Sequence, residues 1–212
     1  MHAVHYSPPL SGLYVILDPS VRPNQPLVNV LRGAAQGGAR IFQYRNKTGS
    51  MKEAYPEALS LRKTAAELGV LFIVNDRCDL AMAVDADGVH LGQHDLPYAE
   101  ARKLLGPEKL IGLSTHNADQ VREAAQFNPD YIGYGPIFKP VSKQDHEPVV
   151  GLDGLRTMRA LTTVPVFAIG GIHLDQVRSV IQAGADGIAV ISAVLHAPDV
   201  KQAVEDLIAQ IS

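Results

Sequence analysis

The chain has 212 residues, of which 46 % are hydrophobic and 19 % charged, and its formal net charge is -3. This near balance of charge argues against a nucleic-acid partner, which needs a basic surface, and a chain without Trp has few side chains on which bases stack. Met1 to Gly12 lacks the pattern of a signal peptide, and no apolar run approaches the roughly 18 residues that span a bilayer, so no membrane partner is expected.

Eight short apolar runs recur along the chain and predict β-strands. Most are rich in Val, Ile, Phe or Tyr, and many are apolar throughout, which is typical of parallel strands covered on both faces. The predicted strands are Leu13–Asp18, Arg40–Arg45, Leu71–Asp76, Gly88–Gly92, Leu110–Ser114, Tyr131–Gly135, Pro165–Gly170 and Gly187–Ser192.

Amphipathic segments lie between these runs and predict helices. Leu27–Gln36 places its apolar residues on one stripe, and Ala54–Leu68 does the same before Gly69, a typical C-cap. Further helices are predicted over Ala118–Phe127, after the N-cap residue Asn117, over Leu174–Ala183, and from about Asp199 to the end.

The alternation of strand and helix predicts an α/β fold, a single (β/α)8 TIM barrel formed by one domain over residues 1–212. The alternative is an open doubly wound sheet. Leu17-Asp18-Pro19-Ser20 follows the first strand where such a sheet carries its glycine-rich phosphate loop, which favours the barrel. The longest irregular connection, Pro136–Val150, indicates a functional loop.

Polar residues follow the second predicted strand, in the segment Gln43-Tyr44-Arg45-Asn46-Lys47. Because side chains alternate along a strand, Gln43, Arg45 and Lys47 share one face. Barrels of this type keep their chemistry at the carboxyl ends of the strands, and two cations there need anionic partners. A bound anion meets that need, and so does an internal ion pair with a carboxylate such as Asp76.

The third and fourth strands each lead to a carboxylate, Asp76 and Asp95. Two carboxylates at neighbouring strand ends suit Mg²⁺, which completes its coordination with water and substrate phosphates. A general acid–base pair is the alternative, and the adjacent cations favour the metal. His90, inside the fourth strand, is interpreted as a hydrogen-bonded core histidine, and Cys78, the only cysteine, as a buried apolar residue of a reducing, cytoplasmic compartment.

The remaining strand ends supply groups that suit phosphate. Ser114 ends the fifth strand, where its hydroxyl could donate to a phosphate; the alternative is that the cluster from Ser114 to Asn117 caps the next helix. The loop after the sixth strand carries Ser142 and Lys143. The seventh and eighth strands lead to Gly170-Gly171 and to Ile191-Ser192, in the loops that commonly hold phosphate in this architecture. These features indicate a magnesium-assisted enzyme for two phosphorylated small molecules, which suggests a transferase with a diphosphate leaving group.

Ordered motifs over roughly Leu13 to Ser192 resemble those of the thiamine phosphate synthase family. The segment Gln43-Tyr44-Arg45-Asn46-Lys47 resembles the family's Gln-x-Arg-x-Lys signature, and the other matching motifs follow in the same order. They are Ile73-Val74-Asn75-Asp76-Arg77, Asp87-Gly88-Val89-His90-Leu91-Gly92-Gln93-His94-Asp95, Ile111-Gly112-Leu113-Ser114, Tyr131-Ile132-Gly133-Tyr134-Gly135-Pro136-Ile137-Phe138, Ala168-Ile169-Gly170-Gly171-Ile172 and Gly184-Ala185-Asp186-Gly187-Ile188-Ala189-Val190-Ile191-Ser192.

The resemblance implies a reaction and a role for each matching residue. The substrates would be hydroxymethylpyrimidine diphosphate and a thiazole phosphate, plain or carboxylated, joined after pyrophosphate has left a pyrimidine carbocation. Asp76 and Asp95 would hold Mg²⁺, and Gln43 would recognise the pyrimidine. The residues that would bind the diphosphate are Arg45, Lys47, Asn75, Ser114 and Lys143, of which Arg45, Lys47 and Lys143 would be catalytic. The thiazole phosphate would contact Ser142, Gly171, Ile191 and Ser192.

The sequence departs from the family pattern in the loop after the sixth strand, where Pro140-Val141-Ser142-Lys143 stands in place of Thr-x-Thr-Lys. Ser142 keeps a hydroxyl, but Pro140 has neither a hydroxyl nor an N–H, which weakens the assignment of phosphate contacts to this loop.

Two other functions fit the same barrel. A related thiazole tautomerase would use a base such as His116, but Lys47, Asp76, Asp95 and Lys143 favour the synthase. A non-catalytic phosphate sensor needs neither the second carboxylate nor the full set of cations. The sequence leaves open whether the chain forms a homo-oligomer.

Overall fold

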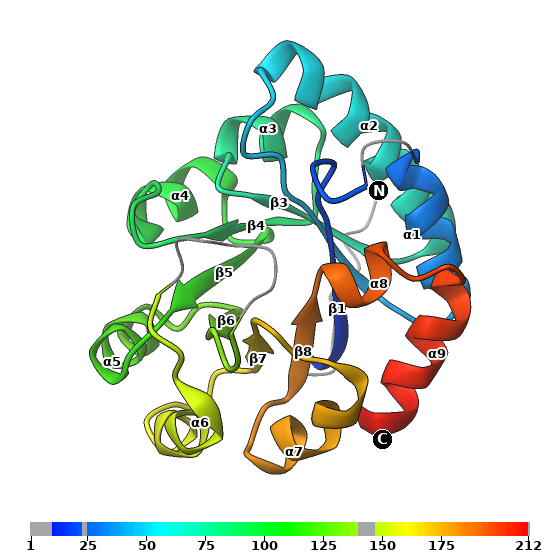
Figure 1. The fold of residues 1–212 in the computed structure, drawn as a ribbon. Coiled ribbons are helices and arrows are strands. Elements are labelled where there is room, and N and C mark those ends of the chain that lie inside the picture. The colour runs from blue at the N-terminus through cyan, green and yellow to red at the C-terminus, as the bar shows by residue number, and fades with distance from the viewer. Residues whose placement is uncertain (1–9, 23–24, 140–146, 212) are drawn as a thin grey trace.

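The computed structural model describes residues 10–22, 25–139 and 147–211, and it contains a closed barrel of eight parallel strands (Figure 1). Each strand pairs with the next along the chain, and the last, β8, pairs with β1 through Leu13 and Ile188. The strands are β1 Gly12–Leu17, β2 Ile41–Tyr44, β3 Leu71–Asn75, β4 Gly88–Leu91, β5 Leu110–Thr115, β6 Tyr131–Tyr134, β7 Val166–Ile169 and β8 Gly187–Val190. This closure confirms the (β/α)8 barrel and excludes the open sheet; one domain over residues 1–212 stays a prediction.

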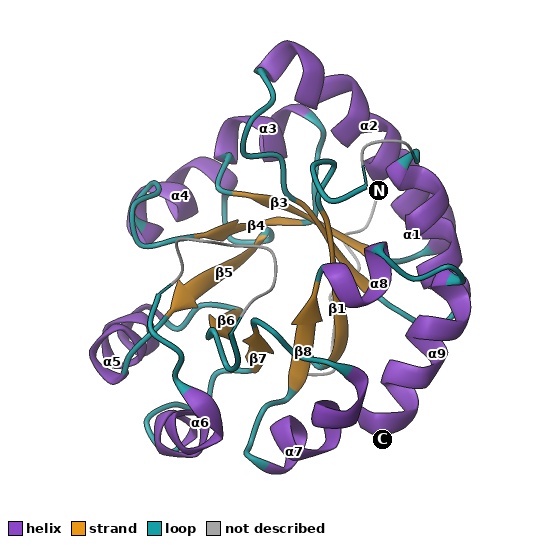
Figure 2. Cartoon of the chain, viewed as in Figure 1, coloured by secondary structure: helices purple, strands orange, loops and turns teal. Residues whose placement is uncertain are grey.

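Helices surround the strands on the outside of the barrel (Figure 2). They are α1 Leu27–Gln36, α2 Met51–Leu68, α3 Cys78–Ala83, α4 Tyr98–Leu105, α5 Ala118–Phe127, α6 Gly151–Arg159, the 3₁₀ turn η1 Leu174–Gln176, α7 Val177–Gln182, α8 Ser192–Leu195 and α9 Val200–Ile211. Among the described residues, no helix combines the length and the apolar character needed to cross a membrane.

Several predicted strand ends are off by one residue, and three predicted boundaries were wrong by more than one. Helix α2 begins at Met51 rather than Ala54, because Ser50 and Glu53 form a capping box that extends the helix by a turn. The predicted helix Leu174–Ala183 starts as a 3₁₀ turn and becomes α-helical only at Val177. The eighth strand ends at Val190 rather than Ser192, which instead begins the short helix α8.

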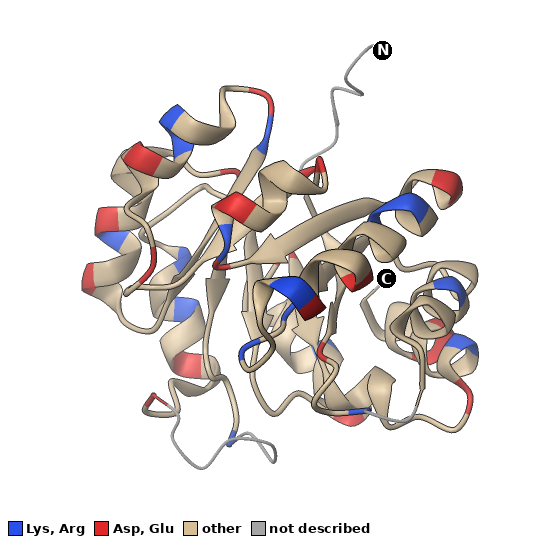
Figure 3. Cartoon of the chain, turned by 90° about the horizontal axis from the view of Figure 1, so that it is seen from above, with Lys and Arg blue, Asp and Glu red and all other residues tan. Residues whose placement is uncertain are grey.

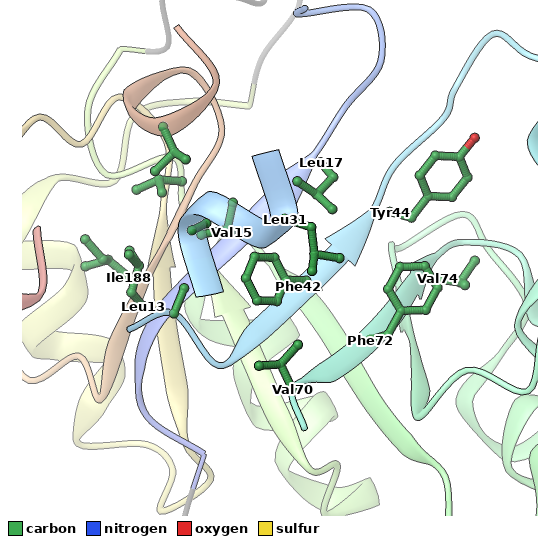
Figure 4. Packing of buried hydrophobic residues seen from close by; sticks show 14 of the residues in the cluster. Leu13, Val15, Leu17, Leu31, Phe42, Tyr44, Val70, Phe72, Val74 and Ile188 are labelled. Atoms are coloured by element: carbon green, nitrogen blue, oxygen red, sulfur yellow. The ribbon is translucent and has the colours of Figure 1, made fainter. Parts of the chain in front are cut away.

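An apolar layer fills the space between the barrel and its helices (Figure 4). Alternate residues of each strand point outward into this layer; Leu13, Val15 and Leu17 of β1 lie there beside Phe42 of β2 and Leu31 of α1. Burial of one such side chain contributes about 1.5–3 kcal/mol to the free energy of unfolding. This outer layer therefore fixes which strand residues are left to face the barrel interior.

The barrel interior holds a second cluster built around three aromatic rings, Tyr14, Tyr131 and Phe167. Their ring centroids lie 5.3 to 5.7 Å apart in edge-to-face pairs. A Cβ on Gly112 would lie only 2.1 Å from Cζ of Tyr131, so the absence of a side chain at Gly112 makes room for that ring. The aromatic layer closes the barrel below its carboxyl end and forms the floor of the site.

Charged residues of both signs are distributed over the helices in a view at right angles to Figure 1 (Figure 3). Several form exposed ion pairs within one helix, such as Asp119 with Arg122 and Asp153 with Arg156. These local pairs account for charges that lie away from the barrel mouth.

Candidate active site

A cavity of about 770 Å³ lies at the carboxyl ends of the strands. The sequence placed twelve residues in a site, and the ten that the structure describes all line this cavity: Gln43, Arg45, Lys47, Asn75, Asp76, Asp95, Ser114, Gly171, Ile191 and Ser192. Ser142 and Lys143 lie outside the described residues. The topology thus brings together side chains that are up to 149 positions apart along the chain, from Gln43 to Ser192.

Strand β2 and the three residues after it divide their polar side chains between the two faces as the alternation predicted. Gln43, Arg45 and Lys47 line the cavity. Tyr44 points outward, where its hydroxyl donates to Glu57 at 2.7 Å and accepts from the Asn46 amide at 3.0 Å. The hydrogen bond from Tyr44 to Glu57 anchors the end of β2 to helix α2, and this holds Arg45 and Lys47 in place.

Both inward cations are paired with carboxylates. Arg45 donates to Asp18, which is only 3 % exposed and also accepts hydrogen bonds from the Ser20 amide at 3.0 Å and the Ser20 hydroxyl. Lys47 donates to Asp76. The internal ion pairing that the sequence left open therefore occurs. Asp18, which ends the first predicted strand, is a functional candidate that sequence reasoning missed.

Asp76 and Asp95 lie close together at the mouth of the barrel. Asp76 adopts a left-handed backbone conformation with φ of 62°, and its N–H donates to the carbonyl of His90 at 2.8 Å. Asp95 accepts a hydrogen bond from the Gly92 N–H at 2.6 Å. Burial, and then the neighbouring Asp76, raise the pKa of Asp95. A bound cation would offset the cost of holding the Asp95 carboxylate charged beside Asp76.

The donor set fits Mg²⁺ better than a metal held entirely by protein. Among the residues that the structure describes, no group of three or more His, Cys, Asp or Glu side chains converges as a metal cage. Mg²⁺ usually takes one or two carboxylates and keeps water or phosphate oxygens for its other positions. Asp76 and Asp95 supply that number, beside Arg45 and Lys47, which suit phosphate.

Ser114 does not cap the helix that follows it. That part is played by Asn117, whose side chain accepts from the Gln120 N–H at 3.0 Å. The Ser114 hydroxyl instead lies 2.8 Å from Nε2 of His90. The cluster from Ser114 to Asn117 therefore does cap the helix, through Asn117, and the Ser114 hydroxyl lies beside the cavity.

His90 is hydrogen-bonded at both ring nitrogens, as the core interpretation predicted, but it also lines the cavity. Its Nδ1 lies 3.1 Å from the hydroxyl of Tyr131, whose ring stacks on the imidazole. Burial lowers the pKa of His90 to about 4, so the ring is neutral at pH 7. Sequence reasoning missed Tyr14 and Tyr131, because an aromatic residue in an apolar run is typical of a core.

On the opposite side of the cavity, the loops after β7 and β8 line the site at Gly170-Gly171 and at Ile191-Ser192. Gly171 has φ of +63°, and a Cβ there would lie 2.7 Å from the carbonyl oxygen of Lys139, so this position suits only glycine. Ile191 immediately precedes helix α8, whose first N–H groups at Ser192 and Ala193 have no acceptor within the helix. This side offers N–H groups rather than cationic side chains.

His116 completes the lining. Its Nδ1 lies 2.7 Å from the carbonyl oxygen of Gly135 and donates to it, which leaves Nε2 as the ring nitrogen without this backbone contact. Its backbone N–H donates to Gln120 at 2.7 Å.

Comparison with known proteins identifies the family of this chain. A model of the thiamine monophosphate synthase family matches residues 13–194. The chain belongs to this family. A curated thiamine-phosphate synthase from Shouchella clausii is 48 % identical over 197 residues, which cover 93 % of this chain and 94 % of that protein. Its counterpart from Chloroflexus aurantiacus is 46 % identical over 200 residues, which cover 94 % and 92 %.

A solved structure of a thiamine monophosphate synthase family member agrees with the fold. The thiamine phosphate pyrophosphorylase from Pyrococcus furiosus superposes with a TM-score of 0.84 at 41 % identity, over 94 % of this chain and 95 % of that one. The resemblance that the sequence motifs indicated is thereby confirmed, and the chain is a transferase of thiamine biosynthesis. The roles of individual residues stay predictions.

Proposed function

We propose that the chain joins hydroxymethylpyrimidine diphosphate to a thiazole phosphate, giving thiamine phosphate and pyrophosphate. The observation that supports this most strongly is that one cavity has two sides of different chemical character. One side has cations and carboxylates, and the other has glycines and the start of a helix. A substitution that releases pyrophosphate needs the first kind of site for the leaving group and the second for a simple phosphate.

The diphosphate is assigned to the side that carries Arg45, Lys47, Asn75 and Ser114, with Lys143 from the loop that lies outside the described residues. Asp76 and Asp95 would hold Mg²⁺, which supplies positive charge to the departing pyrophosphate. When the anion binds, Arg45 and Lys47 gain a second partner besides Asp18 and Asp76. Fixed cations of this kind stabilise charge that develops as the bond to the pyrimidine breaks.

The pyrimidine ring is assigned to the floor of the cavity beside Gln43, where the aromatic layer excludes water from below. The ring's amino group stabilises the carbocation, and the thiazole nitrogen attacks it. Water would capture the same cation, so a dry floor protects the intermediate. Arg45, Lys47 and Lys143 are proposed as the catalytic residues: Arg45 and Lys47 line the side of the cavity assigned to the leaving group, and Lys143 is included on the family resemblance.

The thiazole phosphate is assigned to the backbone of Gly171, Ile191 and Ser192, with Ser142 as a further contact from the loop. N–H groups at a glycine turn and at the start of a helix bind phosphate without needing a cation. This side faces the diphosphate across the cavity, as the attack on the pyrimidine requires.

The first experiment measures pyrophosphate release by the purified protein with both substrates, with and without Mg²⁺. Release that needs Mg²⁺ and matches thiamine phosphate formation would support the proposal. A folded protein that releases none, and instead moves a proton on the thiazole, would be a tautomerase that uses His116. Tight binding without turnover would indicate a sensor. A cytoplasmic location, and partners limited to phosphorylated small molecules, stay predictions from the sequence.

A further inference from the structure

Four side-chain hydrogen bonds form an unbroken network across the barrel interior, through five residues that line the cavity. The Gln43 amide nitrogen donates to the hydroxyl of Tyr14 at 2.8 Å, and that hydroxyl lies 2.8 Å from the hydroxyl of Tyr131. The network continues from Tyr131 to Nδ1 of His90 at 3.1 Å, and from Nε2 of His90 to the hydroxyl of Ser114 at 2.8 Å. It therefore joins the proposed pyrimidine contact to a proposed diphosphate contact, through three residues that the sequence did not assign to the site.

The number of protons on each group determines which residue donates in each hydrogen bond of this network. Burial raises the pKa of both Tyr14 and Tyr131, so each hydroxyl keeps its one proton. Tyr14 accepts from Gln43, and donation to Tyr131 is the bond among the described residues that uses the Tyr14 proton. Tyr131 in turn donates to Nδ1 of His90, which leaves the proton of the neutral ring on Nε2, facing Ser114. Ser114 accepts that hydrogen bond, and its own O–H is free to donate into the cavity.

We propose that Tyr14, Tyr131 and His90 are positioning residues that fix Ser114 as a hydrogen-bond donor to the diphosphate and Gln43 as an acceptor for the pyrimidine amino group. The inference rests on the proposed function for the identity of these two ligand groups. Among the described residues, the side chain of Gln43 has no hydrogen-bond partner other than Tyr14, so its carbonyl oxygen is available to the cavity.

If every hydrogen bond of the network ran in the opposite direction, Gln43 and Ser114 would present the wrong groups to the substrates. That direction would need the Gln43 carbonyl turned toward Tyr14, with the N–H groups presented to the pyrimidine. Ser114 would then donate to His90 and present only lone pairs to the cavity. A phosphate offers only acceptors, so it selects the direction in which Ser114 donates. The same direction selects a ring that carries a donor at Gln43, such as an amino group, and rejects a ring with a carbonyl there.

Supporting contacts hold the network in place. Gln93 donates to the backbone carbonyl of Ser114 at 2.6 Å, and the imidazole of His90 stacks on the ring of Tyr131 with centroids 5.4 Å apart. Gly112 and Gly133 leave the space that the rings of Tyr131 and His90 occupy. A substitution that keeps a ring and removes only its hydroxyl therefore tests the direction of the hydrogen bonds without removing the packing.

The direct test is nuclear magnetic resonance of the protein labelled with ¹⁵N-histidine, with His90→Gln used to assign the His90 signals among the 8 histidines. The proposal expects a protonated Nε2 and an unprotonated Nδ1 in the wild type at neutral pH. A His90 ring protonated on Nδ1 in the wild type would overturn the proposal. This readout needs no turnover, so it stands apart from the assay of pyrophosphate release that tests the proposed function.

The second measurement is calorimetric binding of inorganic pyrophosphate with Mg²⁺ to Tyr131→Phe. We expect affinity to fall about tenfold, the equivalent of about 1.4 kcal/mol, and the His90 signals to shift toward a mixture of tautomers. Tyr134→Phe is the matched control, because it removes a hydroxyl from the same strand on the outward face, and it should change neither result. Unchanged affinity and unchanged His90 signals in a folded Tyr131→Phe would contradict the proposal. If that variant does not fold, Tyr14→Phe breaks the network one link earlier and is expected to give the same two changes.

Discussion

The guanidinium of Arg45 donates a hydrogen bond to the carboxylate of Asp18, across the first two strands of the barrel. The two side chains are 18 % and 4 % exposed, so the pair is largely shielded from water. Asp18 also accepts two hydrogen bonds from Ser20, which fix the direction of its oxygens. The position of the Arg45 cation in the cavity is thus set by a residue outside the sequence motif that contains Arg45.

We expect Asp18→Asn to weaken both the fold and the binding of the pyrimidine diphosphate. Loss of one partner leaves a buried charge without compensation, which costs about 3 kcal/mol of the free energy of unfolding. KM for the diphosphate substrate should rise about tenfold, because Arg45 loses its fixed position. Urea unfolding and steady-state kinetics measure the two effects. Asp153→Asn is the control, since its pair with Arg156 is exposed and contributes less than about 1 kcal/mol. Equal effects of the two substitutions would refute the role of Asp18.

Asp76→Ala should abolish magnesium-dependent turnover and leave the fold intact. The ion pair that it removes is accessible, with Lys47 50 % exposed, so its contribution to stability is about 0–1 kcal/mol. The measurements are turnover against Mg²⁺ concentration and the melting temperature with and without Mg²⁺. Asp79→Ala removes a neighbouring aspartate that pairs with Arg77 and does not line the cavity, so it should retain normal turnover. Normal turnover by Asp76→Ala would exclude Asp76 as a metal ligand.

The lowered pKa of the buried His90 predicts that the protein loses stability at acid pH. Its pKa is lowered by burial from an ordinary 6.5 to about 4 in the folded protein, so the unfolded chain takes up the proton first. The resulting decrease in the free energy of unfolding is absent above pH 6.5 and grows as the pH falls. It is complete below about pH 4, where it reaches at most about 3 kcal/mol. Urea unfolding of wild type and His90→Gln over this range measures it. If both proteins lose stability in parallel below pH 6.5, the neutral buried state of His90 is wrong.

The sequence predicted the barrel and the inward group of β2, because both depend on short-range alternation. Gln43, Arg45 and Lys47 share a face in any strand, whatever the strand's neighbours are. The capping box of Ser50 and Glu53 was also readable, and overlooking it displaced the start of α2 by a turn.

The hydrogen-bond partners within the site could not be predicted in the same way. Tyr14 and Tyr131 are separated by 117 positions, and their contact depends on closure of the barrel and on the register of each strand. Asp18 likewise reaches Arg45 only because β1 and β2 pair in register, Leu17 opposite Tyr44. Pairing of this kind is a property of the folded barrel, since a tyrosine in an apolar run looks the same whether its hydroxyl is used or not.

The space beside Tyr131 gives a test of the cavity floor. A Cβ on Gly112 would lie 2.1 Å from Cζ of Tyr131, whereas one on Gly133 would lie 3.2 Å from Cε1 of His90. We expect Gly112→Ala to displace the Tyr131 ring and to lower the free energy of unfolding by about 3 kcal/mol. Gly133→Ala requires a shift of only a few tenths of an ångström at His90, so its cost should be clearly smaller. Urea unfolding ranks the two variants, and near-ultraviolet circular dichroism reports the tyrosine environment. A Gly112→Ala protein with wild-type stability and an unchanged tyrosine signal would show that the Tyr131 ring moves aside at little cost. The aromatic layer would then not be a rigid support for the site.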